Sequence, residues 1–414
     1  MTTAPAPERQ YSSDLLPDPT PRPRTYTVIS VDDHVVEPPW MFEGRLPAKL
    51  AADAPQIVEL DNGAQVWELS GERYLIMAML AVAGRAKNEW TRGATRYDEM
   101  RPGCYQAADR VRDMDLDGVY ASLNFPSTIG SFAGTGFLRR AAYPELGHAL
   151  VRAWNDWYFD EWRGPFPDRF IGSGLTWLGD PLLAAAEVRR NAARGFTALS
   201  FPENPADVGL PPLASGHWDP VFEACQETET VVALHVGSSQ WFAAHPTSPF
   251  QAECVLFPVA AARAAVEWVW SGVPIRFPQL QISLAEGGIG WVPMVLERMS
   301  YVLEHSGAAQ GEWQWSEHPR DVLRRSFNFC ALEFSAQAES WRSIGIDRVM
   351  VETDYPHADS SWPDTQELIG KAVAGFSPAE VRRVTWQNAS RLYRHPVPAE
   401  LQLPVADAAQ PARA

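Results

Sequence analysis

Short apolar runs rich in β-branched residues recur along the chain, separated by longer stretches with helical periodicity. A short run that is apolar at every position is typical of a strand buried on both faces of a parallel sheet. We therefore expect eight strands, at residues 26–34, 119–125, 170–175, 198–201, 231–235, 281–286, 327–332 and 348–354.

Helical patterns lie between most of these strands and also follow the last one. They cover residues 139–162, 181–194, 218–227, 254–271, 291–304, 333–344, 365–373 and 378–392. Strands that alternate with helices in this way form parallel sheets with crossover helices. Eight such strands predict an α/β fold of the closed (β/α)₈, or TIM-barrel, type, and a doubly wound open sheet is the alternative.

One connection is much longer than the others, because residues 35–117 separate the first strand from the second. Loops that follow barrel strands lie on the face that carries the active site, so this insertion is expected to cover the site. Within it, the segments 65–69 and 72–76 flank Ser70 and Gly71, which predicts a hairpin.

Composition limits the classes of function. The chain has 414 residues, 46% of them apolar, and a formal net charge of −16 without a block of Lys and Arg, which argues against a nucleic-acid partner. It has no run of about 18 apolar residues and no secretion signal, so no membrane partner is expected. Its four cysteines form no CxxC pair, which favours reduced thiols and a cytoplasmic location.

Three segments are expected along the chain. Residues 1–25 are proline-rich and predict a disordered tail. Residues 26–395 form the barrel, and residues 396–414 form a flexible C-terminal tail.

Ionisable residues cluster where the apolar runs end. Asp32 and His34 close the first strand and, being two positions apart, point to the same side of it. His235 ends the fifth strand, Glu286 the sixth and Asp354 the eighth. Because the carboxyl ends of barrel strands meet at one rim, these side chains are expected to converge.

Buried charges without partners are costly, and a shared cation would satisfy them. Two carboxylates and two imidazoles, from Asp32, His34, His235 and Asp354, suit Zn²⁺, Mn²⁺ or Fe²⁺. Each residue alone has a simpler interpretation: a histidine can be hydrogen-bonded in the core, and an aspartate can cap a turn. Their joint occurrence at the ends of strands one, five and eight favours a metal site.

Several motifs resemble the amidohydrolase-related family (amidohydrolase family 2). Residues 31–39, Val-Asp-Asp-His-Val-Val-Glu-Pro-Pro, resemble its opening, and residues 352–357, Glu-Thr-Asp-Tyr-Pro-His, resemble the segment after its last strand. Weaker matches occur at 114–119, 124–126, 276–278 and 284–291. The family includes 2-amino-3-carboxymuconate semialdehyde decarboxylase and γ-resorcylate decarboxylase.

The resemblance implies one divalent metal ion, Zn²⁺ or Mn²⁺, in a (β/α)₈ barrel. Asp32 and His34 match the acid-x-His pair of the decarboxylases, and His235 and Asp354 match two further ligands. Glu286 departs from the family, because many members have a histidine there; it could be protonated, bind the metal, or pair with a base such as His357.

Two reactions suit such a site. In a non-oxidative decarboxylase, the metal chelates an aromatic or enolic carboxylic acid and Asp354 or Glu286 protonates the carbon. In a hydrolase, Asp354 accepts a proton from metal-activated water. His235 could polarise a substrate oxygen in either. The acid-x-His pair favours the decarboxylase; a barrel that serves only as a binding protein is the third alternative.

The substrate pocket is predicted only from position in the loops. Trp241 and His357 are candidates to contact an aromatic carboxylic acid, and Arg85, Arg92 and Arg101 in the insertion are candidates to bind its carboxylate. The role of Glu37 is left open: it could be a metal ligand, a hydrogen-bond partner of a ligand, or a loop residue without a role in the site. Barrels of the family often form homodimers, and the resemblance extends that expectation to this chain.

Overall fold

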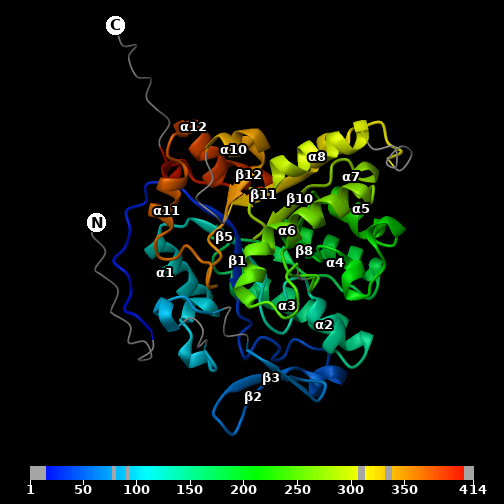
Figure 1. Ribbon diagram of the computed structural model, residues 1–414. Helices are drawn as coiled ribbons and strands as arrows, with labels where there is room; N and C mark the ends of the chain where they lie inside the picture. Colours follow the sequence, from blue (N-terminus) through cyan, green and yellow to red (C-terminus); the bar gives the residue numbers. More distant parts are fainter. Residues whose placement is uncertain are drawn as a thin grey trace.

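The computed structural model describes residues 15–76, 81–89, 94–241, 243–305, 313–331 and 338–404. At its centre, parallel strands are surrounded by helices (Figure 1). The barrel strands are β1 (Ile29–Val35), β5 (Ala121–Pro126), β6 (Phe170–Ile171), β7 (Ser173–Gly174), β8 (Ala198–Phe201), β9 (Val231–His235), β10 (Ile282–Ala285), β11 (Phe327–Ala331) and β12 (Val349–Val351). All eight predicted strands are thereby found, with the third divided into β6 and β7.

Every pairing in the barrel is parallel. β1 pairs with β5 and β5 with β6, while β7 to β12 pair in chain order. The break between β6 and β7 falls at Gly172, where a Cβ would lie 2.8 Å from Cα of Phe196, so only glycine fits. The (β/α)₈ barrel expected from the sequence is confirmed.

Two backbone hydrogen bonds join the segment after β12, the last strand, to β1, the first strand. The N–H of Asp354 donates to the carbonyl of Asp32 at 2.9 Å, and the N–H of His34 donates to the carbonyl of Tyr355 at 2.7 Å. These bonds connect the two edges that an open sheet would leave apart, and they place the segment after β12 directly beside the end of β1.

Helices cover the outside of the strands. They are α2 (Thr135–Arg140), α3 (Pro144–Trp157), α4 (Pro181–Ala193), α5 (Asp219–Glu227), α6 (Phe250–Trp270), α7 (Val273–Arg276), α8 (Val292–His305), α9 (Pro319–Ser326), α10 (Ala338–Ile344), α11 (Thr365–Ala372), α12 (Pro378–Arg382) and α13 (Asn388–Leu392). The helix expected over 139–162 begins at Pro144 and ends in a π-helical turn over Tyr158–Arg163, and a π-helical turn also separates α12 from α13.

Local sequence explains where helices start. Asp180 caps α4 by accepting a hydrogen bond from the N–H of Leu182 at 2.8 Å, and Pro181 occupies the first helical position. Ser377 and Glu380 form a capping box at the start of α12. The core of the molecule is rich in large aromatic side chains, and the buried tryptophans include Trp154, Trp157, Trp162, Trp218, Trp268 and Trp341.

The insertion after β1 has its own small sheet. β2 (Gln56–Glu59), β3 (Gln65–Leu69) and β4 (Glu72–Leu75) are antiparallel, and the sheet projects from one side of the barrel (Figure 1). Ser70 and Gly71 have φ of 56° and 79°, as a two-residue hairpin turn requires. The hairpin is confirmed, while β2 and helix α1 (Ala107–Asp117) were not predicted.

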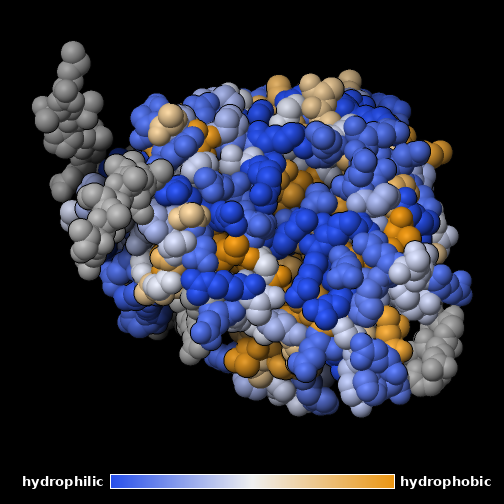
Figure 2. All heavy atoms as spheres, turned by 90° about the horizontal axis from the view of Figure 1, so that it is seen from above, coloured by the Kyte–Doolittle hydropathy of each residue, from blue (hydrophilic) through white to orange (hydrophobic). Residues whose placement is uncertain are grey.

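The described end segments contact the folded chain. Asp18 pairs with Arg101 at 2.6 Å, and the carbonyl of Leu403 accepts hydrogen bonds from Thr27 and Trp386. The face that carries α8, α10 and α12 is largely hydrophilic, with apolar side chains in small scattered groups (Figure 2). Among the described residues, none of the helices combines the length and the apolar character that a membrane span requires.

Candidate metal centre

Four of the predicted ligands converge at the carboxyl ends of β1, β9 and β12. Nε2 of His34 and Nε2 of His235 lie 2.9 Å apart. The carboxylate of Asp32 lies 3.4 Å from the first of these nitrogens and 3.5 Å from the second. Oδ1 of Asp354 lies 3.5 Å from Nε2 of His34. All four side chains are fully buried.

The donor set fits a divalent cation. Two ligands of one ion, each bound at about 2.1 Å, lie about 3.0–3.4 Å apart, which is close to the separations found here. Within the described part of the chain, neither carboxylate oxygen of Asp32 accepts a hydrogen bond, although both are buried. Nδ1 of His235 lies 2.7 Å from the carbonyl of Val236, which leaves Nε2 to face the centre. The arrangement therefore suits a cation held by nitrogen and oxygen ligands.

The pKa shifts of the residues in the centre also favour a bound cation. Burial, and then the neighbouring carboxylates, raise the pKa values of Asp32, Asp354 and Glu286 well above their usual range. Burial lowers the pKa of His235 to about 3 and that of His34 well below its usual range. A bound cation reverses this situation, because it favours ionised carboxylates and neutral imidazoles together.

Glu286 and His357 also reach the centre. Oε2 of Glu286 lies 3.2 Å from Nε2 of His235, so this glutamate stands beside the predicted ligands. The ring of His357 stacks on His34 at 3.7 Å, and its Nδ1 lies 2.8 Å from Oδ1 of Asp354. Two overlapping groups could thus hold an ion: Asp32 with His34 and His235, and His34 with Asp354 and His357.

A break in the register of β1 aims its ligands into the barrel. Pairing with β5 shifts between Ser30 and Asp33, as at a β-bulge. Val31 packs in the barrel interior, and Asp32 and His34 then point to the centre. Bulges commonly redirect side chains next to active sites, and this one lets Asp33 point away from the ligands.

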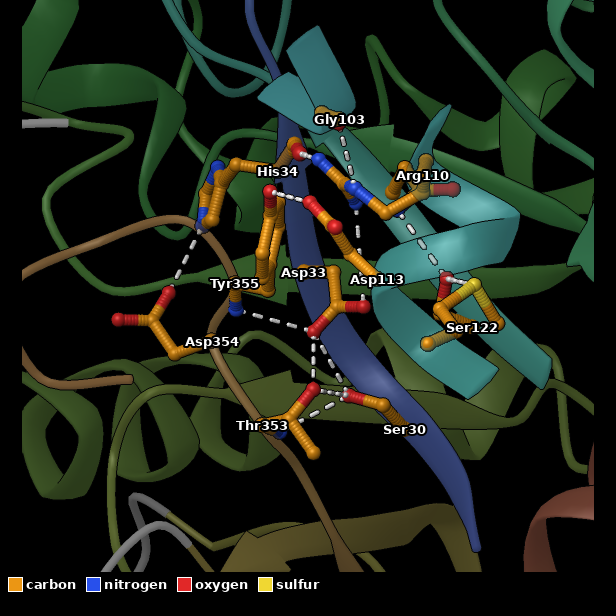
Figure 3. Close-up of polar contacts among 12 residues, drawn as sticks. Ser30, Asp33, His34, Gly103, Arg110, Asp113, Ser122, Thr353, Asp354 and Tyr355 are labelled. Atoms are coloured by element: carbon orange, nitrogen blue, oxygen red, sulfur yellow. Dashed lines mark hydrogen bonds and ion pairs between the residues drawn. The ribbon is translucent and has the colours of Figure 1, made fainter. Parts of the chain in front are cut away.

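Asp33 binds the segment that follows β12 (Figure 3). Its Oδ1 accepts hydrogen bonds from Oγ of Ser30 at 3.0 Å, from Oγ1 of Thr353 at 2.5 Å and from the N–H of Tyr355 at 3.1 Å. Thr353 and Tyr355 flank Asp354, so Asp33 fixes the backbone on both sides of that ligand. Asp354 itself has φ of 50° and Glu286 has φ of 54°, a strained backbone typical of functional sites.

The buried guanidinium of Arg110 holds the backbone of His34 in place. Arg110 of α1 donates to the carbonyls of His34 and Gly103 (Figure 3). Its guanidinium lies 4.2 Å from the ring centre of Tyr355. Tyr355 in turn donates a hydrogen bond to Asp113. Helix α1, which the sequence pattern did not reveal, therefore packs against both ligand segments.

For three of the residues predicted to bind substrate, the contacts found are with residues outside the metal centre. Arg101 donates to Asp113 at 2.8 and 2.7 Å, so its guanidinium serves a buried ion pair. Arg85 is buried and donates to the carbonyl of Glu99 at 2.9 Å. The ring of Trp241 lies 4.6 Å from the guanidinium of Arg263.

Arg92 lies outside the described residues, so its predicted role in binding a carboxylate stays a prediction.

Three residues near the centre were missed or left open by sequence reasoning. Glu352, two positions before Asp354, is buried and accepts a hydrogen bond from the N–H of Glu286 at 3.1 Å; its spacing from Asp354 was the available signal. Glu37 accepts a hydrogen bond from the N–H of Thr128 at 2.8 Å and so binds the β5–α2 loop. The ring of Phe132, in that loop, lies 4.2 Å from the ring of His235, and no periodicity could have revealed it.

The chain belongs to the amidohydrolase family. The family model described as amidohydrolase matches residues 99–395, most of the barrel. A search of curated protein sequences finds no significant match.

Solved structures share the fold. An amidohydrolase of Mycobacterium avium subsp. paratuberculosis K-10 is 21% identical with a TM-score of 0.70, covering 89% of this chain and 99% of its own. A 5-carboxyvanillate decarboxylase of Sphingomonas paucimobilis is 20% identical with a TM-score of 0.61 and the same coverage. A dihydroxybenzoic acid decarboxylase of Polaromonas sp. JS666, with bound manganese and 2-nitroresorcinol, is 17% identical with a TM-score of 0.60, covering 89% of this chain and 97% of its own.

Proposed function

We propose that this member of the amidohydrolase family is a metal-dependent, non-oxidative decarboxylase of an aromatic or enolic carboxylic acid. The observation on which this rests is the convergence of Asp32, His34, His235 and Asp354, all buried, with Glu286 at their side. The proposed cofactor is one divalent ion, Mn²⁺ or Zn²⁺, and Mn²⁺ has the added support of the Polaromonas decarboxylase, which binds it.

When bound, the ion supplies a Lewis acid that holds the substrate's carboxylate and the adjacent oxygen and stabilises developing negative charge. The protein's own groups provide the proton. Glu286, whose carboxyl group lies 3.2 Å from Nε2 of His235, is the proposed donor of the proton to the carbon that loses CO₂. The contact between His357 and Asp354 fixes the carboxylate of Asp354 in the centre.

A metal-dependent hydrolase is the second candidate. The family model is described as amidohydrolase, and the Mycobacterium protein with the TM-score of 0.70 is also called one. In this reaction, Asp354 would accept a proton from water and return it to the leaving group, as a general base that becomes a general acid. The same ligands serve both reactions, so the product decides between them.

The test uses protein loaded with Mn²⁺ and a panel of hydroxybenzoates, with lactones and amides in parallel. Release of CO₂ from a hydroxybenzoate, lost in Asp354→Asn and kept in the exposed α8 variant Glu297→Gln, supports the decarboxylase. Acid produced from a lactone or amide without CO₂ supports the hydrolase. Neither product from any of these substrates would contradict the proposal for this range of substrates.

We further propose that the partner is a small aromatic carboxylic acid. The Polaromonas decarboxylase is bound to an aromatic inhibitor, which supports this substrate class. A homodimer and a cytoplasmic location, both expected from the sequence, remain predictions.

A further inference from the structure

One aromatic ring lies directly on the imidazoles of the centre. The ring centre of Phe132 is 4.2 Å from that of His235, 4.9 Å from that of His34 and 6.2 Å from that of His357. The nearby side chains of Asp32, Asp354 and Glu286 are carboxylates, so Phe132 adds an apolar surface beside a cluster of ionisable groups. Phe132 as a residue is half-buried and keeps some solvent exposure.

The loop that presents this ring, residues 127–134, is held from several directions. Glu37 accepts hydrogen bonds from the N–H and the hydroxyl of Thr128. Arg140 donates to the carbonyls of Thr128 and Ile129, each at 2.9 Å.

The end of the loop is fixed as well. Oγ of Ser200, on β8, donates to the carbonyl of Phe132 itself. Gly136 approaches so closely that a Cβ there would lie 2.3 Å from the carbonyl of Ile129. A loop tied to the insertion, to α2 and to β8 presents the ring in one place.

A second phenylalanine touches the same histidines but cannot meet a substrate. Phe125, the penultimate residue of β5, lies 5.0 Å from His235 and 5.8 Å from His34, ring centre to ring centre. It is fully buried. The two phenylalanines thus contact the same imidazoles, and of the two only Phe132 keeps some solvent exposure.

We propose that Phe132 determines specificity: its ring is the wall against which a planar acid lies, and it keeps water from the ligand imidazoles. A flat ring bound through its carboxylate beside His34 and His235 can stack on Phe132, whereas a puckered saturated ring cannot do so closely. This inference rests on the proposed function, because it assumes a metal-bound carboxylic acid.

The test compares two probes that differ in the flatness of the ring. Salicylate and cis-2-hydroxycyclohexanecarboxylate each have a carboxylate next to a hydroxyl group. Their binding to the Mn²⁺-loaded chain is measured by calorimetry for wild type, Phe132→Leu and Phe132→Ala. Their different affinities for the ion itself apply equally to every variant, so they cancel from the comparison.

Replacement of Phe132 should lower the preference for the flat probe by about two- to tenfold, the range expected for one aromatic contact. The variants should retain Mn²⁺, and the water-proton relaxivity of the bound Mn²⁺ should rise as water gains access, more in Phe132→Ala than in Phe132→Leu. Phe125→Leu is the matched control: it removes a ring from the same histidines, so stability falls while the preference between the probes is unchanged.

The outcomes separate the two proposals. Equal preference and equal relaxivity in all variants, with Mn²⁺ bound, would overturn the role of Phe132 and leave the metal centre standing. If Phe125→Leu and Phe132→Leu lost the preference for the flat probe equally, Phe132 would act only through packing, and the inference would also be overturned. A wild-type chain that binds no Mn²⁺ would overturn the proposed function first, and this inference with it.

Discussion

Oε2 of Glu286 lies 3.2 Å from Nε2 of His235, the nitrogen that faces the other ligands. Glu286 directly follows β10, and this contact places its carboxyl group beside the centre and not in the helix layer. In the metal-free chain, burial and then the charge of Asp354 raise the pKa of Glu286 well above its usual range. We therefore propose Glu286, from its position beside His235, as the proton donor of the reaction.

Replacement of Glu286 by Gln is therefore expected to remove catalysis and spare the centre. The amide keeps the size of the side chain but has no acidic proton, so the rate of CO₂ release should fall about 10²–10⁴-fold. Metal content should stay near that of wild type. Loss of Mn²⁺ together with activity would instead assign Glu286 to the ligands, and an unchanged rate would exclude it from proton transfer.

Asp33 is expected to control metal affinity without touching the metal. In Asp33→Ala, the carboxylate oxygen that accepts hydrogen bonds from Ser30, Thr353 and Tyr355 is lost, so the backbone around Asp354 is released. Affinity for Mn²⁺, measured by competition with a chelator, should fall about 10–100-fold. The exposed variant Glu297→Gln is the control, and equal affinities in the two variants would contradict the role of Asp33.

The buried pair of Arg101 and Asp113 is expected to matter for stability. Replacing Arg101 by Met leaves Asp113 buried without its partner, so the free energy of unfolding should fall by about 3–5 kcal/mol in denaturant titrations. Asp113→Leu in the same chain should recover much of this loss. The exposed pair of Lys371 and Glu367 is the control, because Lys371→Ala should change stability by about 0.5 kcal/mol or less.

Glu352 makes the stability of the metal-free chain depend on pH. Burial, and then the charge of Asp354, raise its pKa to about 8, well above that of a glutamate in the unfolded chain. Between about pH 5 and pH 8 the folded state therefore holds more protons than the unfolded state, and stability falls as pH rises. Below this range both states are protonated and the penalty is absent.

Glu352→Gln removes that ionisation. In the metal-free protein the variant should gain stability over wild type as the pH rises from 5 to 8, by an amount on the order of 2–4 kcal/mol. Chemical unfolding at each pH measures the difference. A gap between variant and wild type that stays constant across this range would show that Glu352 does not titrate there.

Much of the fold could be predicted because its signal is local. The strands over 198–201 and 231–235 were placed without error, since both are short apolar runs buried on both faces. The helix over 139–162 was placed less well: Thr135–Arg140 and Pro144–Trp157 are separate helices, and a proline at the first position of the second marks its start.

The convergence of Asp32, His34, His235 and Asp354 could be predicted because each lies at or near the carboxyl end of a strand, and a barrel brings these ends together. Phe132 could not, since its contact with His235 depends on the conformation of a loop fixed by Glu37, Arg140 and Ser200 from elsewhere in the chain. The pairing of Arg101, a candidate to bind the substrate's carboxylate, with Asp113 could not be predicted either, because Asp113 lies on a helix that the pattern did not reveal.

The most direct test of the account is the metal content of the purified protein after exposure to Mn²⁺ and removal of the excess. Wild type should hold about one equivalent and should melt at a higher temperature than the metal-free chain, because an ion that binds only the folded state stabilises it. His235→Ala should lose both effects, and Phe125→Leu should keep the metal. Less than about 0.3 equivalents in wild type, with no change in melting temperature, would contradict the centre itself.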